Sequence, residues 1–597
     1  MTPTEEPDAV DPDLLAGELE PEHGSDPHLD ELLKAEAPLS LAGDGLTDLD
    51  ADLLCATRPS TVILLAGRVR SGKTTLLTSI YEQLNQQPFG SFLFAGSDTL
   101  FGFEKRGHGW REHAGMSEPM TERTGLNQPP WLHLLLREAS APPHQLLLAD
   151  LSGEHFDRLV SGERAPSSLS MVSRADHVAV VLNGRKLSDP KERLTERSRA
   201  EQLLQILAAD GVLSKDCLLS LVVTKLDRYL LDGRDDDLDD VAERIRSTAN
   251  LDRPLPLFRT AAQPQMSDYP VGHGVDALLA YWLTSRMRPF TQSASPRRHR
   301  QPSSALGLIG TETVMDSRIC MLGLPGSGKT SYLAALYELL SHHDVEGAPR
   351  LIALPEDRKY LQRIHEKWLR CESAVRTRDS GAPEGVRFDL RLEDSAPKTV
   401  SVPDVAGEAV RALWEERRWK SGLDELARSA SGVLLFIKAN DIVQPLRVQR
   451  AMDPKARRQP VLDEEPDFAA IPFDPGGSPT QVKLVDLIRA VLDLRATRRL
   501  RLAIVISAWD MVTQEEVTPL ELIRLRMPLL WQYLASNPEL IVFRTYGVSA
   551  QGGDFENPSD SERLLSVEPP AKRAIVVGED IASHDVSHPL RWLWSLQ

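Results

Sequence analysis

The stretch that decides the fold is Thr61-Val-Ile-Leu-Leu-Ala-Gly-Arg-Val-Arg-Ser-Gly-Lys-Thr74. Its first half is a short apolar run rich in branched side chains, which predicts a buried strand. Gly-x-x-x-x-Gly-Lys-Thr follows at once, and an amphipathic helix begins behind it. A strand, a glycine-containing loop and a helix in this order gather backbone N–H groups and a helix N-terminus around an anion. The stretch therefore predicts a phosphate-binding P-loop.

A second copy of this pattern is Arg318-Ile-Cys-Met-Leu-Gly-Leu-Pro-Gly-Ser-Gly-Lys-Thr330. Both copies continue alike, through two alternating strands, an Asp-x-x-Gly-Glu at a strand end and two further apolar strands. The last of these runs ends in Thr224-Lys-Leu-Asp227 in one copy and in Ser507-Ala-Trp-Asp510 in the other. The repeat predicts an α/β fold of two tandem P-loop modules, each a mostly parallel sheet with helices on both faces.

Composition divides the chain into parts. We predict an acidic disordered tail at 1–57, a first module at 58–290, a Ser/Pro/Arg linker at 291–316 and a second module at 317–597. A Pro/Gly-rich insertion at about 454–480 is predicted to be a surface loop. The tail is open to two interpretations, a solvated spacer or an acidic arm that docks on a basic partner.

Charge and hydropathy exclude several classes of function. Residues 1–54 hold 16 acidic residues against one lysine, while the whole chain carries −18, so the rest is nearly neutral. A nearly neutral body without a basic stripe argues against nucleic-acid binding. No run is long and apolar enough for a membrane span, and the acidic N-terminus is unlike a secretory signal. With four widely spaced cysteines, these features favour a cytoplasmic protein.

The P-loops supply most of the candidate site residues. The lysines would reach the β- and γ-phosphates, and the following threonine hydroxyls would bind Mg²⁺. The aspartates of Asp-x-x-Gly would bind Mg²⁺ through water, and the glycine amides would meet the γ-phosphate. The predicted nucleotide-binding residues are Gly67, Arg70, Ser71, Gly72, Lys73, Thr74 and Thr75, with Gly323, Gly326, Ser327, Gly328, Lys329, Thr330 and Ser331; the metal ligands are Thr74, Asp150, Thr330 and Asp404; the γ-phosphate glycines are Gly153 and Gly407.

The last apolar strand of each copy predicts how the base is read. A carboxylate at Asp227 can accept hydrogen bonds from N1 and N2 of guanine, a pair of donors that adenine lacks. Thr224 and Lys225 complete this motif, the lysine stem covering the base. The second copy keeps Asp510 but loses the lysine, so its guanine selectivity stays open; Ser549 and Ala550 there are candidates to place an amide on guanine O6.

Read together, these motifs resemble the TRAFAC class of Ras-like GTPases over both modules. The paired Asp-x-x-Gly-Glu, the Arg-Thr pairs and the segment 95–106 further resemble bacterial double-GTPase proteins of conflict and defence systems. The resemblance implies GTP/GDP and Mg²⁺ as cofactors. It also implies regulator or effector proteins as partners, and it leaves open a pairing of the two G domains or a homodimer.

The resemblance also brings candidates for catalysis. Thr124 and Thr377 would be the switch threonines that close over Mg²⁺, with Thr99 as a rival in the first copy. The arginines just before them, Arg123 and Arg376, are either internal arginine fingers or exposed side chains without a role. Glu154 and Glu408 stand where many Ras-like enzymes carry the glutamine that orients the attacking water.

Three functions compete on this reading. The leading one is a GTP-binding switch that hydrolyses slowly, because a carboxylate beside the γ-phosphate adds negative charge, and because Val69 and Pro325 at the third P-loop position crowd an incoming arginine. The second is a nucleotide-bound scaffold in which the second or both modules do not hydrolyse. The third, a P-loop ATPase of another class, is disfavoured, since Thr-Lys-x-Asp has no role there.

Overall fold

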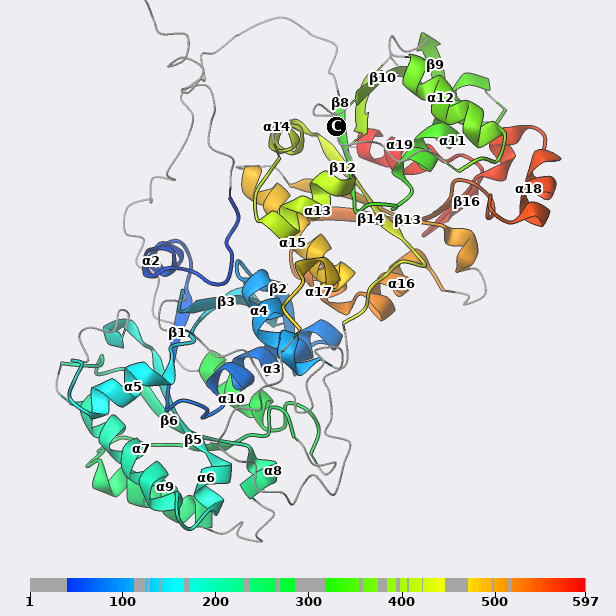
Figure 1. Cartoon of the computed structure of the whole chain (residues 1–597). Helices are drawn as coiled ribbons and strands as arrows, with labels where there is room; N and C mark the ends of the chain where they lie inside the picture. The colour runs from blue at the N-terminus through cyan, green and yellow to red at the C-terminus, as the bar shows by residue number, and fades with distance from the viewer. Residues whose placement is uncertain are drawn as a thin grey trace, which may run out of the picture. The chain divides into compact units, whose positions relative to one another are not determined.

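The computed structural model in Figure 1 is coloured from blue through cyan to green along the first module and from green through yellow to red along the second. It describes residues 40–111, 125, 129–138, 141–165, 172–209, 211–229, 237–264, 269–284, 317–342, 344–353, 358–373, 384–392, 398–404, 407–420, 422–445, 471–495, 499–512 and 517–595.

The first module is built on a sheet whose described strands follow the order β2-β3-β4-β1-β5-β6-β7. Neighbours from β4 to β7 pair in parallel, whereas β2 and β3 are antiparallel additions at one edge. The parallel strands therefore end at a common edge, where P-loop proteins bind ligands. The strands are β1 (Ser60–Ala66), β2 (Phe92–Gly96), β3 (Trp131–Glu138), β4 (His144–Ala149), β5 (His177–Asn183), β6 (Leu218–Thr224) and β7 (Leu257–Arg259).

Helices cover both faces of this sheet because its central strand is apolar on both sides. Ile63 and Leu65 face a core shared with α3 and α10, and Val62 and Leu64 face a core shared with α5, α7 and α9. The helices of the module are α2 (Asp48–Thr57), α3 (Lys73–Gln86), α4 (Leu100–Gly107), η2 (His108–Trp110), α5 (Gly153–Val160), η4 (Val172–Arg174), α6 (Gly184–Ser188), α7 (Arg193–Ala208), α8 (Leu226–Tyr229), α9 (Asp237–Thr248) and α10 (Val275–Thr284).

The second module repeats this topology in its described residues, with the strand order β16-β15-β14-β13-β12-β8-β11-β10-β9. Strands β9 and β10 are antiparallel at one edge like β2 and β3, and β15 and β16 extend the other edge. The strands are β8 (Ser317–Gly323), β9 (Arg350–Ala353), β10 (Glu384–Arg391), β11 (Lys398–Asp404), β12 (Gly432–Lys438), β13 (Leu500–Ser507), β14 (Ile541–Ser549), β15 (Ile575–Gly578) and β16 (Ile581–Ser583).

Helices again lie on both faces of the second sheet. One core joins α11, α12 and α19 to one side of β8, and the opposite side of β8 packs with α13 and α15. The helices are α11 (Lys329–His342), α12 (Arg358–Leu369), α13 (Gly407–Glu416), α14 (Leu423–Ser429), η7 (Pro475–Gly477), α15 (Thr480–Leu494), η8 (Trp509–Met511), α16 (Pro519–Arg526), α17 (Pro528–Ala535), α18 (Pro558–Leu565), η10 (Pro570–Arg573) and α19 (His588–Ser595).

The predicted fold class, two tandem α/β modules with mostly parallel sheets, is confirmed. The predicted disordered tail is too long at its end, because residues 40–57 are ordered. Leu46 forms a bridge with Trp131 of β3, and a capping box of Thr47 and Asp50 starts α2. The end of the insertion also differs from a free loop, since Ser478 is buried just before α15 begins. The linker at 291–316 lies outside the described residues.

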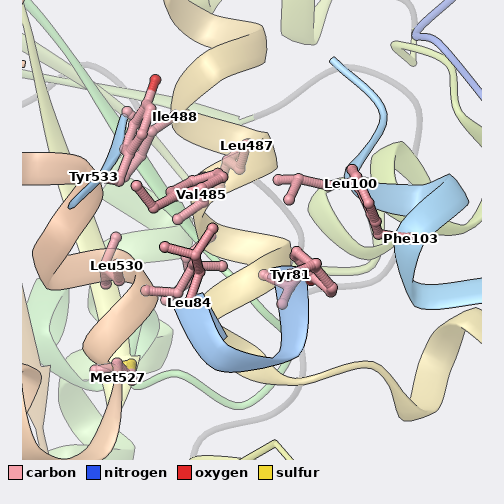
Figure 2. Packing of buried hydrophobic residues seen from close by; sticks show 14 of the residues in the cluster. Tyr81, Leu84, Leu100, Phe103, Val485, Leu487, Ile488, Met527, Leu530 and Tyr533 are labelled. Atoms are coloured by element: carbon pink, nitrogen blue, oxygen red, sulfur yellow. The ribbon is translucent and has the colours of Figure 1, made fainter. Parts of the chain in front are cut away.

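A single apolar core crosses from one module to the other. The chain from Ser40 to Gln597 is one compact unit. Within it, α3 and α4 of the first module share buried contacts with α15 and α17 of the second. Figure 2 shows Leu84 of α3 among Val485 of α15 and Leu530 of α17, with Leu100 of α4 close to Leu487. The modules are therefore joined by a hydrophobic interface.

Buried amide side chains add directional contacts to this interface. Gln532 Nε2 donates to the carbonyl of Leu84 at the end of α3 (2.7 Å), and its Oε1 accepts from the Phe94 N–H of β2 (3.0 Å). Gln481 Nε2 likewise donates to the Asn85 carbonyl at 2.9 Å. These side chains satisfy backbone groups of α3 and β2 that would otherwise be buried without partners.

Replacing Gln532 with alanine is expected to lower the free energy of unfolding by about 1–3 kcal/mol, because it leaves the Phe94 N–H and the Leu84 carbonyl buried and unpaired. Urea denaturation of the full chain measures the loss. Glu539→Gln is the matched control at the same interface, since Glu539 pairs with Arg137 but is largely exposed. That control is expected to stay within about 0.5 kcal/mol of the parent. A Gln532→Ala variant as stable as the control would contradict the prediction.

Candidate functional site

The first P-loop lies between β1 and α3, and its lysine closes it. The Lys73 ammonium donates to the carbonyls of Gly67 (2.7 Å) and Arg68 (3.0 Å). Burial lowers the pKa of Lys73 to about 8, with Asp150 opposing the shift. An anion placed beside this ammonium would raise that pKa again, which favours an anionic ligand. The second loop repeats the arrangement, with Lys329 donating to Gly323 at 2.8 Å.

The backbone of both loops turns in the same way. Arg70 and Gly72 have φ angles of 63° and 92°, and their counterparts Gly326 and Gly328 have 73° and 87°. Left-handed residues between right-handed ones point successive N–H groups into one concavity, which binds anions. Arg70 adopts a conformation that glycine takes more cheaply. Its carbonyl accepts hydrogen bonds from Asn183 Nδ2 at 3.0 Å and from the Lys225 ammonium at 3.3 Å.

The predicted metal side is assembled in the first module. Thr74 Oγ1 donates to Asp150 Oδ1 at 3.0 Å, and Asp150 is completely buried at the end of β4. Arg106 of α4 occupies the other carboxylate oxygen, with its Nε 3.0 Å from Oδ2. In the second module, β11 ends at Asp404, the strand position that corresponds to Asp150, next to β8. The side chain of Asp404 lies outside what the structure describes.

These residues fit a nucleotide with Mg²⁺. The buried Ser71 hydroxyl has no hydrogen-bond partner among the described residues, so the loop holds an unsatisfied polar group beside Lys73. Over the same residues, no group of three or more His, Cys, Asp or Glu side chains could hold a metal by itself. An ion at Thr74 and Asp150 would thus take its remaining ligands from phosphate and water, which is the coordination that Mg²⁺ prefers.

The glycines of Asp-x-x-Gly lie against the third P-loop position. A Cβ added to Gly153 would stand 2.1 Å from the Val69 nitrogen, and one added to Gly407 would stand 2.5 Å from Pro325 Cα. Only glycine fits so close to another backbone. Glu154 follows Gly153 in the first turn of α5, as Glu408 follows Gly407 in α13. The sequence-predicted residues of the P-loop and of Asp-x-x-Gly are therefore brought together in both modules.

A hydroxyl at the end of the next-to-last parallel strand fixes each P-loop from behind. Thr224 Oγ1 donates to the Ser71 carbonyl at 2.6 Å, and Ser507 Oγ donates to the Ser327 carbonyl at 2.8 Å. Gly72 packs directly on Thr224, where an added Cβ would come within 3.1 Å of the hydroxyl. The shared Thr or Ser therefore positions the loop, a role that the sequence alone did not assign.

The segment predicted to read the base differs between the modules. Lys225 and Ala508 share a left-handed backbone, with φ of 53° and 52°, so they are structural equivalents. Burial lowers the pKa of Lys225 to about 8, with the neighbouring Arg185 and Lys186 adding to the effect. Asp227 is buried, with 2% of its surface exposed. The second module has no lysine stem here.

The second module surrounds its carboxylate with other groups. Asp510 Oδ1 accepts a hydrogen bond from Ser549 Oγ at 2.5 Å. Trp509 packs over Gly547 of β14, where an added Cβ would come within 2.2 Å of the indole ring. The Ala550 carbonyl accepts from Trp368 Nε1 at 2.8 Å. Asp510 and Ser549 are thus in direct contact, with Ala550 next in the chain, and a role of this segment in base binding stays a prediction.

Some of the other candidate residues lie outside the described residues, and the rest have described contacts. Thr124, Thr377, Arg123 and Arg376 lie outside the described residues. Thr99 is completely buried at the start of α4, and its hydroxyl accepts from the His133 N–H at 2.9 Å, so it holds α4 to β3. Thr75 and Ser331 are the second residues after the P-loop lysines, and Ser331 Oγ accepts from Gln551 Nε2 at 3.3 Å.

Arg106 is the residue that sequence reasoning missed. Its partner Asp150 is 44 positions away, and no local pattern connects the two. The signal in the sequence is that Arg106 ends the segment 95–106, which resembles double-GTPase proteins.

Family comparisons match each module separately. Residues 61–283 match the family model described as Double-GTPase 2, and residues 320–593 match the one described as Double-GTPase 1. Together with the two P-loops, these matches define a tandem GTPase-domain protein that binds guanine nucleotide. The chain belongs to the double-GTPase family, with a Double-GTPase 2 module followed by a Double-GTPase 1 module.

Other comparisons add little. No curated protein is significantly similar to the chain. Among solved structures, that of Methanosarcina barkeri Roco2 RocCORdC bound to GDP matches with 14% identity and a TM-score of 0.22. The match covers 42% of this chain and 53% of that one, and a likeness this weak supports no statement about function. Within the described ranges, every helix is too short or too polar to span a lipid bilayer.

Proposed function

We propose that this chain is a GTP-binding tandem GTPase that hydrolyses slowly and acts as a nucleotide-dependent switch for protein partners. The observation that carries the proposal is the closure of each P-loop by two other motifs. The glycine of Asp-x-x-Gly abuts the third loop position, and a Thr or Ser hydroxyl holds the loop carbonyl. Loss or gain of the γ-phosphate would then shift the first residues of α5 or α13.

In the first module each candidate site residue would hold a different part of the nucleotide. Lys73 and the loop amides would hold the phosphates, and Asp227 would accept the guanine N1 and N2 hydrogens. Thr74 and Asp150 would hold Mg²⁺, which supplies charge neutralisation at the phosphates when bound. The Gly153 amide would meet a γ-phosphate oxygen, and the close approach of Gly153 to the Val69 backbone of the loop supports this role.

Slow hydrolysis follows from what surrounds that phosphate. Glu154 and Glu408 can accept a proton from water but add negative charge to a site that is already anionic. The backbones of Val69 and Pro325 lie against Gly153 and Gly407, and we expect their side chains to crowd an arginine that a partner would bring to this place. We propose that a partner protein raises the rate by another route, and that such partners belong to a bacterial conflict or defence system, as the family resemblance suggests.

A second candidate treats the second module as a nucleotide-bound scaffold that does not hydrolyse. The observations that favour it are the loss of the lysine at Ala508 and the hydrogen bond that Ser549 makes to Asp510. The segment predicted to read the base thus differs from that of the first module, while the phosphate loop is retained. An ATPase of another class has no such support in either module.

Nucleotide competition and turnover test these alternatives. The full chain is expected to prefer GTP and GDP over ATP and to turn over GTP more slowly than ~1 s⁻¹, at the low end of typical enzyme rates. Displacement of a fluorescent GDP measures selectivity, and phosphate release under saturating GTP and Mg²⁺ measures turnover. Selective binding without any turnover would favour the scaffold, and preference for ATP would overturn the proposal. A rate above ~1 s⁻¹ would refute the slow-hydrolysis part.

A further inference from the structure

Arg106 stands at the predicted metal side of the first module without a part in any of the motifs. It is 4% exposed, and its Nε donates to Asp150 Oδ2 at 3.0 Å, on the carboxylate that also holds the Thr74 hydroxyl. Both oxygens of Asp150 are therefore engaged by side chains. Any movement of this carboxylate toward a metal-bound water must be accommodated by Arg106.

The rest of the guanidinium ties Arg106 into α4. Its Nη1 donates to the carbonyls of Gly102, at 3.2 Å, and of Asp44. Its Nη2 is buried and has no hydrogen-bond partner in the described part of the chain. Phe103 of the same helix stacks on Tyr81 of α3, with ring centroids 4.9 Å apart. Arg106 and α4 thus form one packed unit beside the P-loop helix.

The opposite side of α4 touches the second module. Phe101 and Arg106 are five residues apart, which places them about 140° from each other around the helix. The ring centroids of Phe101 and Trp414 lie 5.4 Å apart. Trp414 is on α13, the helix that begins at Gly407 and follows Asp-x-x-Gly of the second module. Helix α4 therefore contacts Asp150 through Arg106 and contacts α13 through Phe101.

A chain of buried and partly buried ion pairs runs beside this aromatic contact. Asp98, just before α4, pairs with Arg489 of α15 at 2.9 Å, and Arg489 also reaches Asp486 at 3.3 Å. Asp486 in turn pairs with Arg417 at 2.6 Å. The Arg417 guanidinium lies 5.2 Å from the Phe101 ring centre. One end of this charged chain, Asp98, therefore lies just before α4, and the other end, Arg417, contacts Phe101 of α4. These contacts fix α4 against the second module.

We propose that α4 couples the two nucleotide sites, with Arg106 as the positioning residue that links Asp150 to it. Binding of Mg²⁺ and nucleotide at the first site changes what Asp150 must hold, and Arg106 moves with that carboxylate. Because α4 is a short rigid helix packed on both sides, its displacement reaches Phe101 and shifts Trp414 and α13. The inference rests on the proposed nucleotide binding by the first module.

Hydrogen exchange of the full chain tests the coupling. Lys329→Ala silences the second P-loop, so that added GDP and Mg²⁺ fill only the first site. Exchange of the α13 segment 407–416 is then expected to change on nucleotide addition. Arg106→Gln and Phe101→Ala are expected to abolish this change in the Lys329→Ala background, while Arg106→Lys, which keeps the charge, retains part of it. Glu539→Gln, at an interface contact away from α4, should leave it intact.

A second measurement separates positioning from a loss of structure. The ratio of GDP affinity with Mg²⁺ to GDP affinity in EDTA is expected to change about fivefold or more in Arg106→Gln, in the range of typical couplings, and not in Phe101→Ala. An unaltered α13 response in both variants would overturn the coupling, as would no response in the Lys329→Ala protein saturated with GDP. If Arg106→Gln fails to fold, Phe101→Ala and Arg106→Lys decide. A Lys329→Ala protein that binds no GDP would instead refute the proposed function of the first site.

Discussion

Lys73→Ala is expected to weaken GDP and GTP binding at the first site by roughly two to three orders of magnitude, and Lys329→Ala to do the same at the second. Each ammonium is almost fully buried and bridges the loop's own carbonyls, so its removal takes away the charge opposite the phosphates and a brace of the loop. A hydrogen bond to a charged group contributes about 1.5–3 kcal/mol, and ~1.4 kcal/mol is a tenfold change in affinity. The ammonium can donate to two phosphate oxygens, and the loss of two such bonds of about 1.5–2 kcal/mol each corresponds to the expected two to three orders.

Calorimetric titration of the full chain measures this result as a change of stoichiometry. The parent is expected to bind two nucleotides and each single variant one, while the double variant binds none. Lys572→Ala, which removes an exposed lysine, is the control and should bind like the parent. Unchanged stoichiometry in Lys73→Ala would show that the first loop is not a nucleotide site. If the parent binds one nucleotide and only Lys73→Ala removes it, the second module does not bind nucleotide.

Asp227→Asn is expected to lower GDP affinity at the first site by ~10² to 10⁴ and to remove the preference for guanine over adenine. In the proposed function this carboxylate accepts two guanine hydrogens, and two charge-assisted hydrogen bonds contribute about 3–6 kcal/mol together. The amide of asparagine can accept only one of them and presents its own donor to the other. The buried position of Asp227 makes the mismatch costly, because water cannot replace the lost partner.

The measurement is competition of GDP and ADP for the first site, made in the Lys329→Ala background. Xanthosine diphosphate adds a gain-of-function readout, because its 2-oxo group can accept from the asparagine amide. Asp510→Asn in the Lys73→Ala background is the matched variant at the second site. Its effect is expected to be smaller, since Asp510 already accepts from Ser549 and lacks a lysine neighbour. Intact guanine preference in Asp227→Asn would disprove the assignment of this residue.

Much of the fold could be predicted because its key contacts are short in sequence. The P-loop lies within eight residues, and the lysine bonds to the first residue of its own loop. The alternation of Ile63 and Leu65 with Val62 and Leu64 already indicates a strand covered on both sides. Asp-x-x-Gly and the final Thr or Ser follow apolar strands in the same order in both modules, so a common sheet edge brings them to the loop.

The edge elements β2 and α4 could not be predicted in this way. Phe92–Gly96 is too short for a clear alternation, and residues 97–130, which include undescribed chain, separate it from its partner β3. The order of residues 40–57 likewise could not be predicted from their acidic composition, because it comes from the bridge of Leu46 to Trp131. Contacts with distant strands outweighed local composition in both cases.

The sequence by itself determined that this protein has two P-loop modules, and that the first carries a fuller guanine-reading motif than the second. Those properties follow from local spacing, since a strand, a loop and a helix form a phosphate site wherever the residues stand in that order. Only the tertiary structure decided that Arg106 holds Asp150 and that Gln532 holds the end of α3. The physical reason is that such contacts join residues up to 448 positions apart, and they exist only when the packing of both modules brings buried polar groups together.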